Sequence, residues 1–171
     1  MSIVLDGDNL TSTGVPNTRT AQASTSGTSI DFTGIPAGVK RITVMFSGVS
    51  TNGSSAYPMV QIGAGSVTTS GYTSASGIMN NANGTTVLTS TAGFPIRQAG
   101  STSASTYGTM TLALIGSNLW VSSHSFADVV DVVVGSGGGS VTLGGTLDRV
   151  RFTTTNGTDT FDAGSINILY E

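Results

Sequence analysis

The sequence contains no cysteine, and it has only one lysine (Lys40), one glutamate (Glu171) and one histidine (His124). The lack of cysteine excludes a disulfide framework and thiol chemistry. Charged residues make up 9% of the chain, whereas they make up roughly 25% of an average globular domain. Because the side chains from which most catalytic sites are built are scarce, we expect that this protein is not an enzyme.

The shortage of charge also excludes some kinds of partner. The six basic residues are scattered along a chain of net charge −3, so there is no basic stripe to neutralise the phosphates of a nucleic acid. The longest apolar cluster, Val129–Val134, is interrupted by Asp131 and is far too short to cross a bilayer. We therefore expect neither nucleic acid nor a membrane as a partner.

Small and hydroxylated residues are abundant instead: the chain has 24 glycines, 24 serines and 27 threonines. Apolar residues alternate with polar ones in short runs, as in Ile42, Val44 and Phe46, and no segment has helical periodicity. The alternation predicts an all-β chain that folds as a β-sandwich of the jelly-roll type. The predicted strands are residues 29–33, 41–47, 59–62, 109–115, 119–122, 128–134, 141–143, 149–153 and 165–170.

The segments between these runs have turn chemistry. Asn-Gly pairs suit turns that need positive φ, and Gly116–Asn118 suits a tight hairpin. The run Gly135–Ser140 lacks the lysine and the following helix of a phosphate-binding loop, so we expect it to be a flexible hairpin tip. Residues 63–108 contain few strong strands, and we expect irregular strands and exposed loops there, where binding tends to occur. The Asn-Gly pairs are residues 52–53, 83–84 and 156–157.

Two parts of the chain differ in composition. Residues 1–27 have little apolar content after Ile3–Leu5 and read as an extended N-terminal arm, either a disordered tail or a segment that orders on a partner. Residues 28–171 form the predicted β-sandwich domain. With so few charges, its sheet edges would favour association unless they are covered, so we expect an oligomer; a monomer solvated by hydroxyls and amides is the alternative.

Two clusters could carry chemistry, and each has a structural alternative. His124 lies among serines in Ser122–Ser125 and would be the base for nucleophilic catalysis, but serines are so frequent that this proximity is expected by chance. Asp159 and Asp162 could bind calcium, although turn capping explains them equally well. The sequence therefore indicates no catalytic residue, no metal and no cofactor.

Three tyrosines, Tyr57, Tyr72 and Tyr107, stand in polar, glycine-rich surroundings. An exposed ring there could stack on a sugar or pack on a protein partner, whereas the alternative is a ring half-buried beneath its own loop. These residues are the candidate glycan or partner contacts.

Two long blocks resemble a known family. Residues 29–54 (SIDFTGIPAGVKRITVMFSGVSTNGS) resemble the opening of a domain at the C-termini of bacteriophage tail fibres and related virion appendage proteins. Residues 147–171 (LDRVRFTTTNGTDTFDAGSINILYE) resemble its closing. Gly93–Ile96 and Gly116–Trp120 also fit the pattern, so the likeness covers nearly all of residues 28–171.

The resemblance implies a β-rich, trimeric appendage on the virion surface: a short tail or head fibre, a spike or a capsid decoration with a role in host attachment. It transfers no functional residue to this sequence. Residues 1–27 would dock on other virion proteins of the capsid or tail, and the β domain would project. Such a chain would be a short fibre or decoration, or a fragment of a longer fibre.

Two other functions remain open. The chain could be a carbohydrate-binding module that recognises bacterial surface polysaccharide through loop tyrosines, Trp120 and amides. It could also be an enzyme that degrades such polysaccharide, which would require two carboxylates facing one groove.

Overall fold

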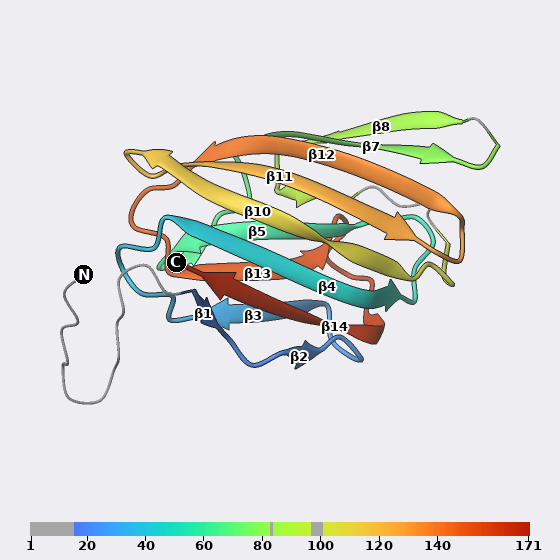
Figure 1. The fold of residues 1–171 in the computed structure, drawn as a ribbon, viewed down its shortest axis with the longest axis horizontal. Helices are drawn as coiled ribbons and strands as arrows, with labels where there is room; N and C mark the ends of the chain where they lie inside the picture. The colour runs from blue at the N-terminus through green and yellow to red at the C-terminus, as the bar shows by residue number, and fades with distance from the viewer. Residues whose placement is uncertain (1–15, 83, 97–100) are drawn as a thin grey trace.

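The structure, a computed structural model, describes residues 16–82, 84–96 and 101–171 (Figure 1). Within these residues the regular secondary structure consists of β-strands, which confirms the predicted all-β class. The strands are β1 (Asn17–Thr18), β2 (Gln22–Ala23), β3 (Ser29–Thr33), β4 (Arg41–Thr51), β5 (Pro58–Ala64), β6 (Ser66–Val67), β7 (Thr73–Asn80), β8 (Thr85–Ser90), β9 (Phe94–Pro95), β10 (Thr106–Gly116), β11 (Leu119–Asp128), β12 (Val133–Thr142), β13 (Arg149–Thr154) and β14 (Phe161–Tyr170).

The larger of two sheets has nine strands in the order β1-β14-β4-β10-β11-β12-β7-β8, and β2 also pairs with β14. Its neighbouring strands are antiparallel. The β10–β11 hairpin turns through Ser117 and Asn118, whose φ values are +47° and +62°. Positive φ at both central residues matches the twist of the flanking strands, and the predicted hairpin is confirmed.

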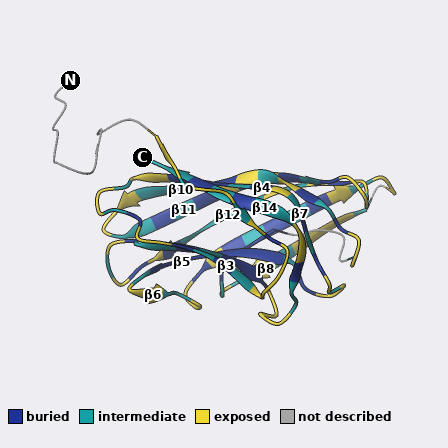
Figure 2. Cartoon of the chain, turned by 90° about the horizontal axis from the view of Figure 1, so that it is seen from below, coloured by how far each residue is buried: buried dark blue, intermediate teal, exposed yellow. Residues whose placement is uncertain are grey.

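The smaller sheet has the order β3-β13-β5-β6, with β9 also paired to β5. Figure 2 shows the two sheets as two layers whose buried residues face each other. The chain passes from one sheet to the other at most of its long connections, because β3, β5 and β13 alternate along the sequence with β4, β7 and β14. The result is a sandwich-like arrangement with one apolar interior.

The interior follows from period-two alternation. Ile42, Val44 and Phe46 of β4 point inward, as the sequence pattern predicts. Phe152 of β13 packs against Phe46 and Phe161, with ring centroids 5.7 Å and 5.8 Å apart. The other large, fully buried side chains are Trp120, Tyr72, Phe94, Ile62, Ile96, Met110, Leu112, Ile166 and Ile168.

Two adjacent predictions around β12 are wrong. The predicted strand 128–134 is instead the end of β11, a turn at residues 129–132 and the first two residues of β12. The predicted flexible tip, Gly135–Ser140, lies inside β12 and pairs with β11 on one side and β7 on the other. Valine is frequent in strands and glycine is not. Propensity alone therefore predicts a strand at the valine-rich turn and a turn at the glycine-rich strand, the opposite of what the structure has.

Packing explains why glycine occupies β12. A Cβ atom at Gly137 would lie 2.4 Å from the carbonyl oxygen of Ala75 and 2.5 Å from Cε1 of His124. At Gly135 it would lie 2.4 Å from Cζ of Phe126. The rings of His124 and Phe126 of β11 therefore lie against the glycine residues of β12. The two rings are stacked, with their centroids 6.0 Å apart.

Part of the predicted N-terminal arm belongs to the β domain, so the boundary drawn at residue 27 differs from the structure. β1 and β2 both pair with β14, and Ser24 is buried, with its N–H donating to the carbonyl oxygen of Gly164 at 2.9 Å. The remainder of the predicted arm, residues 1–15, lies outside the described residues.

Candidate interaction surface

The two ends of the large sheet are set by its registers. At one end Asn17 lies opposite Tyr170, so β1 and the C-terminal part of β14 are together. The opposite end is formed by the end of β4, the start of β10, the end of β11 and the start of β12. We call this the distal end, because it lies away from β1 and from the C-terminus (Figure 1).

A row of apolar side chains crosses the outer face of the large sheet near the distal end. Met79 of β7 lies opposite Val134 of β12, and Val134 lies opposite Ala127 of β11. Ala127 in turn lies opposite Tyr107 of β10. Met79, Val134 and Tyr107 are 61%, 50% and 40% exposed. We call these four residues the distal band.

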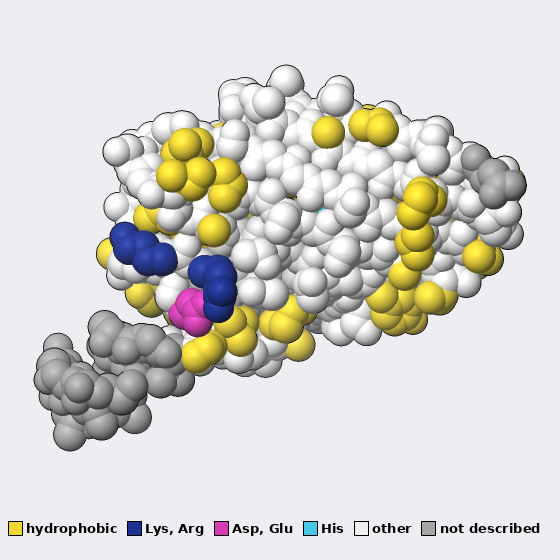
Figure 3. Space-filling model, turned by 45° about the horizontal axis from the view of Figure 1, so that its top comes forward, with side chains coloured by type: hydrophobic (Ala, Val, Ile, Leu, Met, Phe, Trp, Pro, Cys, Tyr) yellow, Lys and Arg dark blue, Asp and Glu magenta, His cyan; other side chains and the backbone are white. Residues whose placement is uncertain are grey.

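The surroundings of the distal band are almost uncharged. Figure 3 shows a narrow row of apolar side chains near the end of this face that lies away from the Lys and Arg side chains, with a second apolar group at the opposite end; most of the rest of the face is uncharged polar side chains and backbone. A groove of about 300 Å³ adjoins the band, and Met79 and Val134 of the band line it together with Gly77 and Val87. This surface therefore favours contact with an apolar or neutral group over a charged one.

The β11–β12 turn extends the apolar surface beyond the band. Val129, Val130 and Val132 are each more than half exposed. The turn forms because Oδ1 of buried Asp128 accepts hydrogen bonds from the N–H groups of Val130 (3.2 Å) and Asp131 (3.3 Å). An aspartate that caps the following backbone in this way folds the chain back on itself, and the valines are left at the tip.

The same turn brings two carboxyl groups together. Oδ1 of Asp128 accepts a further hydrogen bond from the N–H of Ser105 (3.1 Å), but within the described part of the chain the buried Oδ2 atoms of Asp128 and Asp131 have no hydrogen-bond partner. Burial, followed by the negative charge of Asp128, raises the pKa of Asp131. No basic side chain of the described residues forms a salt bridge with either group.

Tyr107 is the candidate contact residue that the structure places within an exposed apolar surface. Its ring lies over Gly48, where a Cβ atom would come within 3.3 Å of the tyrosine Oη, and Gly48 has a φ of +63°. Tyr57 also lies at the distal end, but it precedes β5 of the smaller sheet and is half-buried. Its N–H donates to Oγ1 of Thr155 at 3.1 Å.

Tyr72 is not an exposed ring, so its prediction as a contact residue is wrong. It is 2% exposed, and its ring meets Phe94 edge to face with centroids 4.9 Å apart. Its Oη accepts the N–H of Ile62 at 2.9 Å and lies 3.0 Å from the carbonyl oxygen of Thr68. Burial raises the pKa of Tyr72 to about 12. Trp120 is also buried and offers no stacking surface.

His124 lies inside the molecule. Its Nε2 is 3.0 Å from Oγ of Ser76, a residue on β7, rather than from a serine in its own segment. Both residues are buried, and Nδ1 of His124 has no hydrogen-bond partner among the residues that the structure describes. Burial lowers the pKa of His124 to about 4, so the ring is neutral near pH 7. Among the described residues, the hydrogen bonds and salt bridges give this ring no carboxylate partner.

Asp159 and Asp162 belong to the turn region between β13 and β14. Oδ1 of Asn156 accepts the N–H groups of Thr158 (3.0 Å) and Asp159 (3.1 Å), and Nδ2 of Asn156 donates to Oδ1 of Asp159. Ser50 bonds to the Asp162 carboxylate. The local bonds fit turn formation at Asn156-Gly157, and the described residues contain no group of three or more side chains suited to a metal ion.

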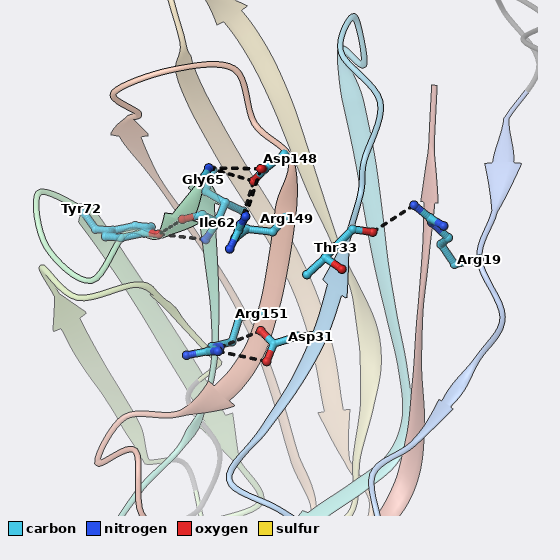
Figure 4. A network of polar contacts seen from close by, with 9 residues as sticks. All are labelled: Arg19, Asp31, Thr33, Ile62, Gly65, Tyr72, Asp148, Arg149 and Arg151. Atoms are coloured by element: carbon cyan, nitrogen blue, oxygen red, sulfur yellow. Dashed lines mark hydrogen bonds and ion pairs between the residues drawn. The ribbon is translucent and has the colours of Figure 1, made fainter.

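Two of the three salt bridges among the described residues lie on the smaller sheet, away from the distal band, and the third joins Arg41 of β4 to Glu171. Arg151 makes two hydrogen bonds to Asp31 (2.7 Å and 3.0 Å), and Arg149 makes two to Asp148 (2.7 Å and 3.1 Å). Figure 4 shows both pairs beside Arg19, which reaches the carbonyl oxygen of Thr33. Hydrogen bonding from Arg149 lowers the pKa of Asp148. These pairs cross-link β13 with β3 and fasten the loop at Gly65.

Sequence reasoning missed the distal band apart from Tyr107. Met79 and Val134 look like ordinary strand residues, and only the pairing of β7 with β12 brings them together. The exposed valines had a detectable signal, because Asp128 directly precedes them and Asp131 lies among them, a spacing that suits a capped turn.

Comparisons with protein-family models, curated proteins and solved structures found no match to this chain. In the described residues, no helix has the length and apolar character needed to span a membrane.

Proposed function

We propose that the protein is a non-enzymatic structural component of a phage virion, a short fibre, spike or decoration, whose distal end makes the outward contact. The observation that carries this proposal is the polarity of the large sheet. β1 and the C-terminal part of β14 share one end, where Ile115 is exposed. At the other end, the distal band and the three turn valines supply six of the eight exposed large hydrophobic side chains among the described residues. A projecting module needs this separation of a tethered end from a contacting end.

The placement of the two resemblance blocks supports the proposal. The block 29–54 contains β3 and β4, and the block 147–171 contains β13 and β14. β3 pairs with β13, and β4 pairs with β14. The residues that carry the resemblance are thus neighbours in both sheets, although more than half of the chain separates them. Within this proposal the fold is a jelly-roll variant, in keeping with its repeated crossings between sheets.

Docking on the particle is assigned to residues before β1, since residues 17–18 and 22–23 are already paired with β14. In this proposal three copies assemble on the virion surface, and linked weak contacts gain avidity from their high effective concentration. Host-surface glycan or protein is the proposed outer partner.

Immunogold electron microscopy of virions with an antibody against this chain tests the location. Binding of purified protein to host cells tests the contact, with Val130→Ser/Val132→Ser as the distal variant and Ser123→Thr, on the middle of the same face, as its control. We expect the distal variant alone to lose binding. The absence of the chain from virions would overturn the proposal, and equal binding by both variants would remove the distal end from it.

A carbohydrate-binding module is the second candidate, and the exposed ring of Tyr107 favours it. Its role would be to stack on a sugar at the edge of the distal band. A glycan array compares the protein with Tyr107→Ala and with Tyr57→Ala. Loss of a glycan signal in Tyr107→Ala alone would support this function, and an array without any signal would count against it.

A further inference from the structure

The last strand of the large sheet, β8, is an edge strand. Among the described residues it pairs with β7 along residues 85–90 and with no other strand. In an antiparallel ladder, alternate residues of an edge strand direct their N–H and C=O groups away from the neighbouring strand. Such a row of backbone groups is complementary to another extended strand.

β8 lacks the features that usually protect a sheet edge. Its sequence, Thr-Thr-Val-Leu-Thr-Ser, contains no charged residue and no proline, and it favours β structure. The neighbouring strands β7 and β12 are also without charge. The opposite edge of the sheet differs: β1 and β2 have two residues each, and Arg19 between them bonds to the carbonyl oxygens of Thr33 and Gly34.

The outer side of β8 is also apolar at its centre. Val87 is 72% exposed, the largest value among the described large hydrophobic side chains, and it lies opposite Gly77. Antiparallel pairing of two β8 strands about Val87 would make the two valines cross-strand neighbours, each shielding the other from water.

We propose that β8 pairs antiparallel with β8 of a second copy of this chain, so that the large sheet continues across a two-fold axis. The occupant is a second copy because an antiparallel pair of identical strands is self-complementary. β8 also has no charged residue that would favour a partner of opposite charge. A two-fold contact does not close a trimer, so it joins copies, or trimers, in pairs. This inference stands apart from the virion function.

The absence of cysteine allows a direct test. Val87→Cys places a thiol at the centre of the proposed contact, and Ser123→Cys places one on the exposed middle of the same sheet face as the control. Paired Val87→Cys strands would bring the two residues within disulfide-forming range. We expect oxidation to give covalent dimers of Val87→Cys and little of Ser123→Cys; equal yields would overturn the proposal.

Mass measurement by light scattering gives an independent reading. Val87→Lys places like charges opposite each other across the proposed axis, which should weaken association about tenfold or more, while Ser123→Lys should leave it unchanged. Circular dichroism checks that each variant is folded. The proposed β8–β8 pairing would be excluded if the wild-type protein were monomeric at high concentration, or if Val87→Lys left the measured mass unchanged. A different protein would then be the candidate partner of the β8 edge.

Discussion

The two halves of the large sheet bury different kinds of residue. Where β14, β4 and β10 face the smaller sheet, the inward positions hold residues such as Val44, Met110 and Ile168. Where β12 and β7 continue beyond β11, many inward positions hold glycine or serine, including Gly137 and Ser76. The first half is filled by its own side chains, whereas the second is filled largely by rings that lean across from β11.

The difference teaches that one sheet can meet two packing demands. The first half gains stability from apolar area removed from water. In the second half, close approach of backbone and rings requires the absence of Cβ atoms, and the buried polar groups must find partners, as Ser74 Oγ does with the carbonyl oxygen of Gly93 at 2.7 Å. Substitutions should therefore act differently in the two halves.

The largest effect is expected where the first half packs against β13 of the smaller sheet. Phe152→Ala removes a ring that contacts Phe46 and Phe161 and should lower the free energy of unfolding by about 3–5 kcal/mol. Leu88→Ala, on the half-buried side of β8, should cost only about 1 kcal/mol. Urea unfolding followed by fluorescence measures both. Equal losses would show that β8 belongs to the core as fully as β13 does.

Adding a methyl group should harm the second half. Gly137→Ala brings a Cβ atom against the carbonyl oxygen of Ala75 and should lower the free energy of unfolding by about 1–3 kcal/mol, the usual cost of overpacking. Gly144→Ala is the matched control, because nothing lies within 4 Å of its added Cβ. A Gly137→Ala protein as stable as the control would contradict the packing explanation for the glycine-rich strand.

Acid should also affect the second half, through His124. Its pKa is lowered from 6.5 to about 4, so the unfolded chain binds a proton more readily than the native state does. Stability should therefore fall as the pH drops from 6.5 toward 4. At about pH 5.5 the loss should reach about 1 kcal/mol, because one pKa unit corresponds to roughly 1.4 kcal/mol.

His124→Gln isolates this contribution, since glutamine does not titrate. Unfolding curves across this pH range should show a shallower decline for the variant than for the wild-type protein. Parallel declines would mean that His124 is reached by solvent in the native state and that this half of the sheet is more open than described.

The same contrast explains how much the sequence could predict. Alternation identified β3, β4, β13 and β14, because each buries one face with apolar residues. It failed over most of β7 and β12, where the buried face is mainly serine and glycine and the buried apolar residues Ile78, Val133 and Val141 lie near the strand ends. The strand assignment of Gly135–Ser140 depends on Phe126 and His124, which reach it only through the pairing of β11 with β12.

The contact surface was predictable to a similar extent. Polar surroundings in the sequence suggested exposure for both Tyr107 and Tyr72. Tyr72 is nevertheless buried, and its hydroxyl forms hydrogen bonds with backbone atoms of Ile62 and Thr68. The local sequence cannot distinguish a buried tyrosine from an exposed one here, because the hydrogen-bond partners of the Tyr72 hydroxyl are backbone atoms of a neighbouring strand and loop. Long-range register likewise assembles the distal band from residues on four strands.

The smallest effect should come from charge, and its sign should differ between the regions. The pKa of Asp131 is raised above 3.8 by burial and by Asp128, so the stabilisation from its bound proton is present at low pH and lost as the pH rises through that raised pKa. Asp131→Asn should therefore stabilise the protein at pH 7 by about 0.2–1 kcal/mol, the range of single charge contacts near a surface. The gain should vanish near pH 3, where Asp131 is protonated.

Asp148→Asn is the counterpart on the smaller sheet. Arg149 lowers the pKa of Asp148, so that carboxylate stabilises the native state above its ordinary pKa, and the amide should lower the melting temperature at pH 7. Thermal melts of both variants at pH 7 and pH 3 test this. At pH 7 the melting temperature should rise for Asp131→Asn and fall for Asp148→Asn. Shifts of the same sign would mean that a positive charge near the β11–β12 turn offsets the repulsion between Asp128 and Asp131.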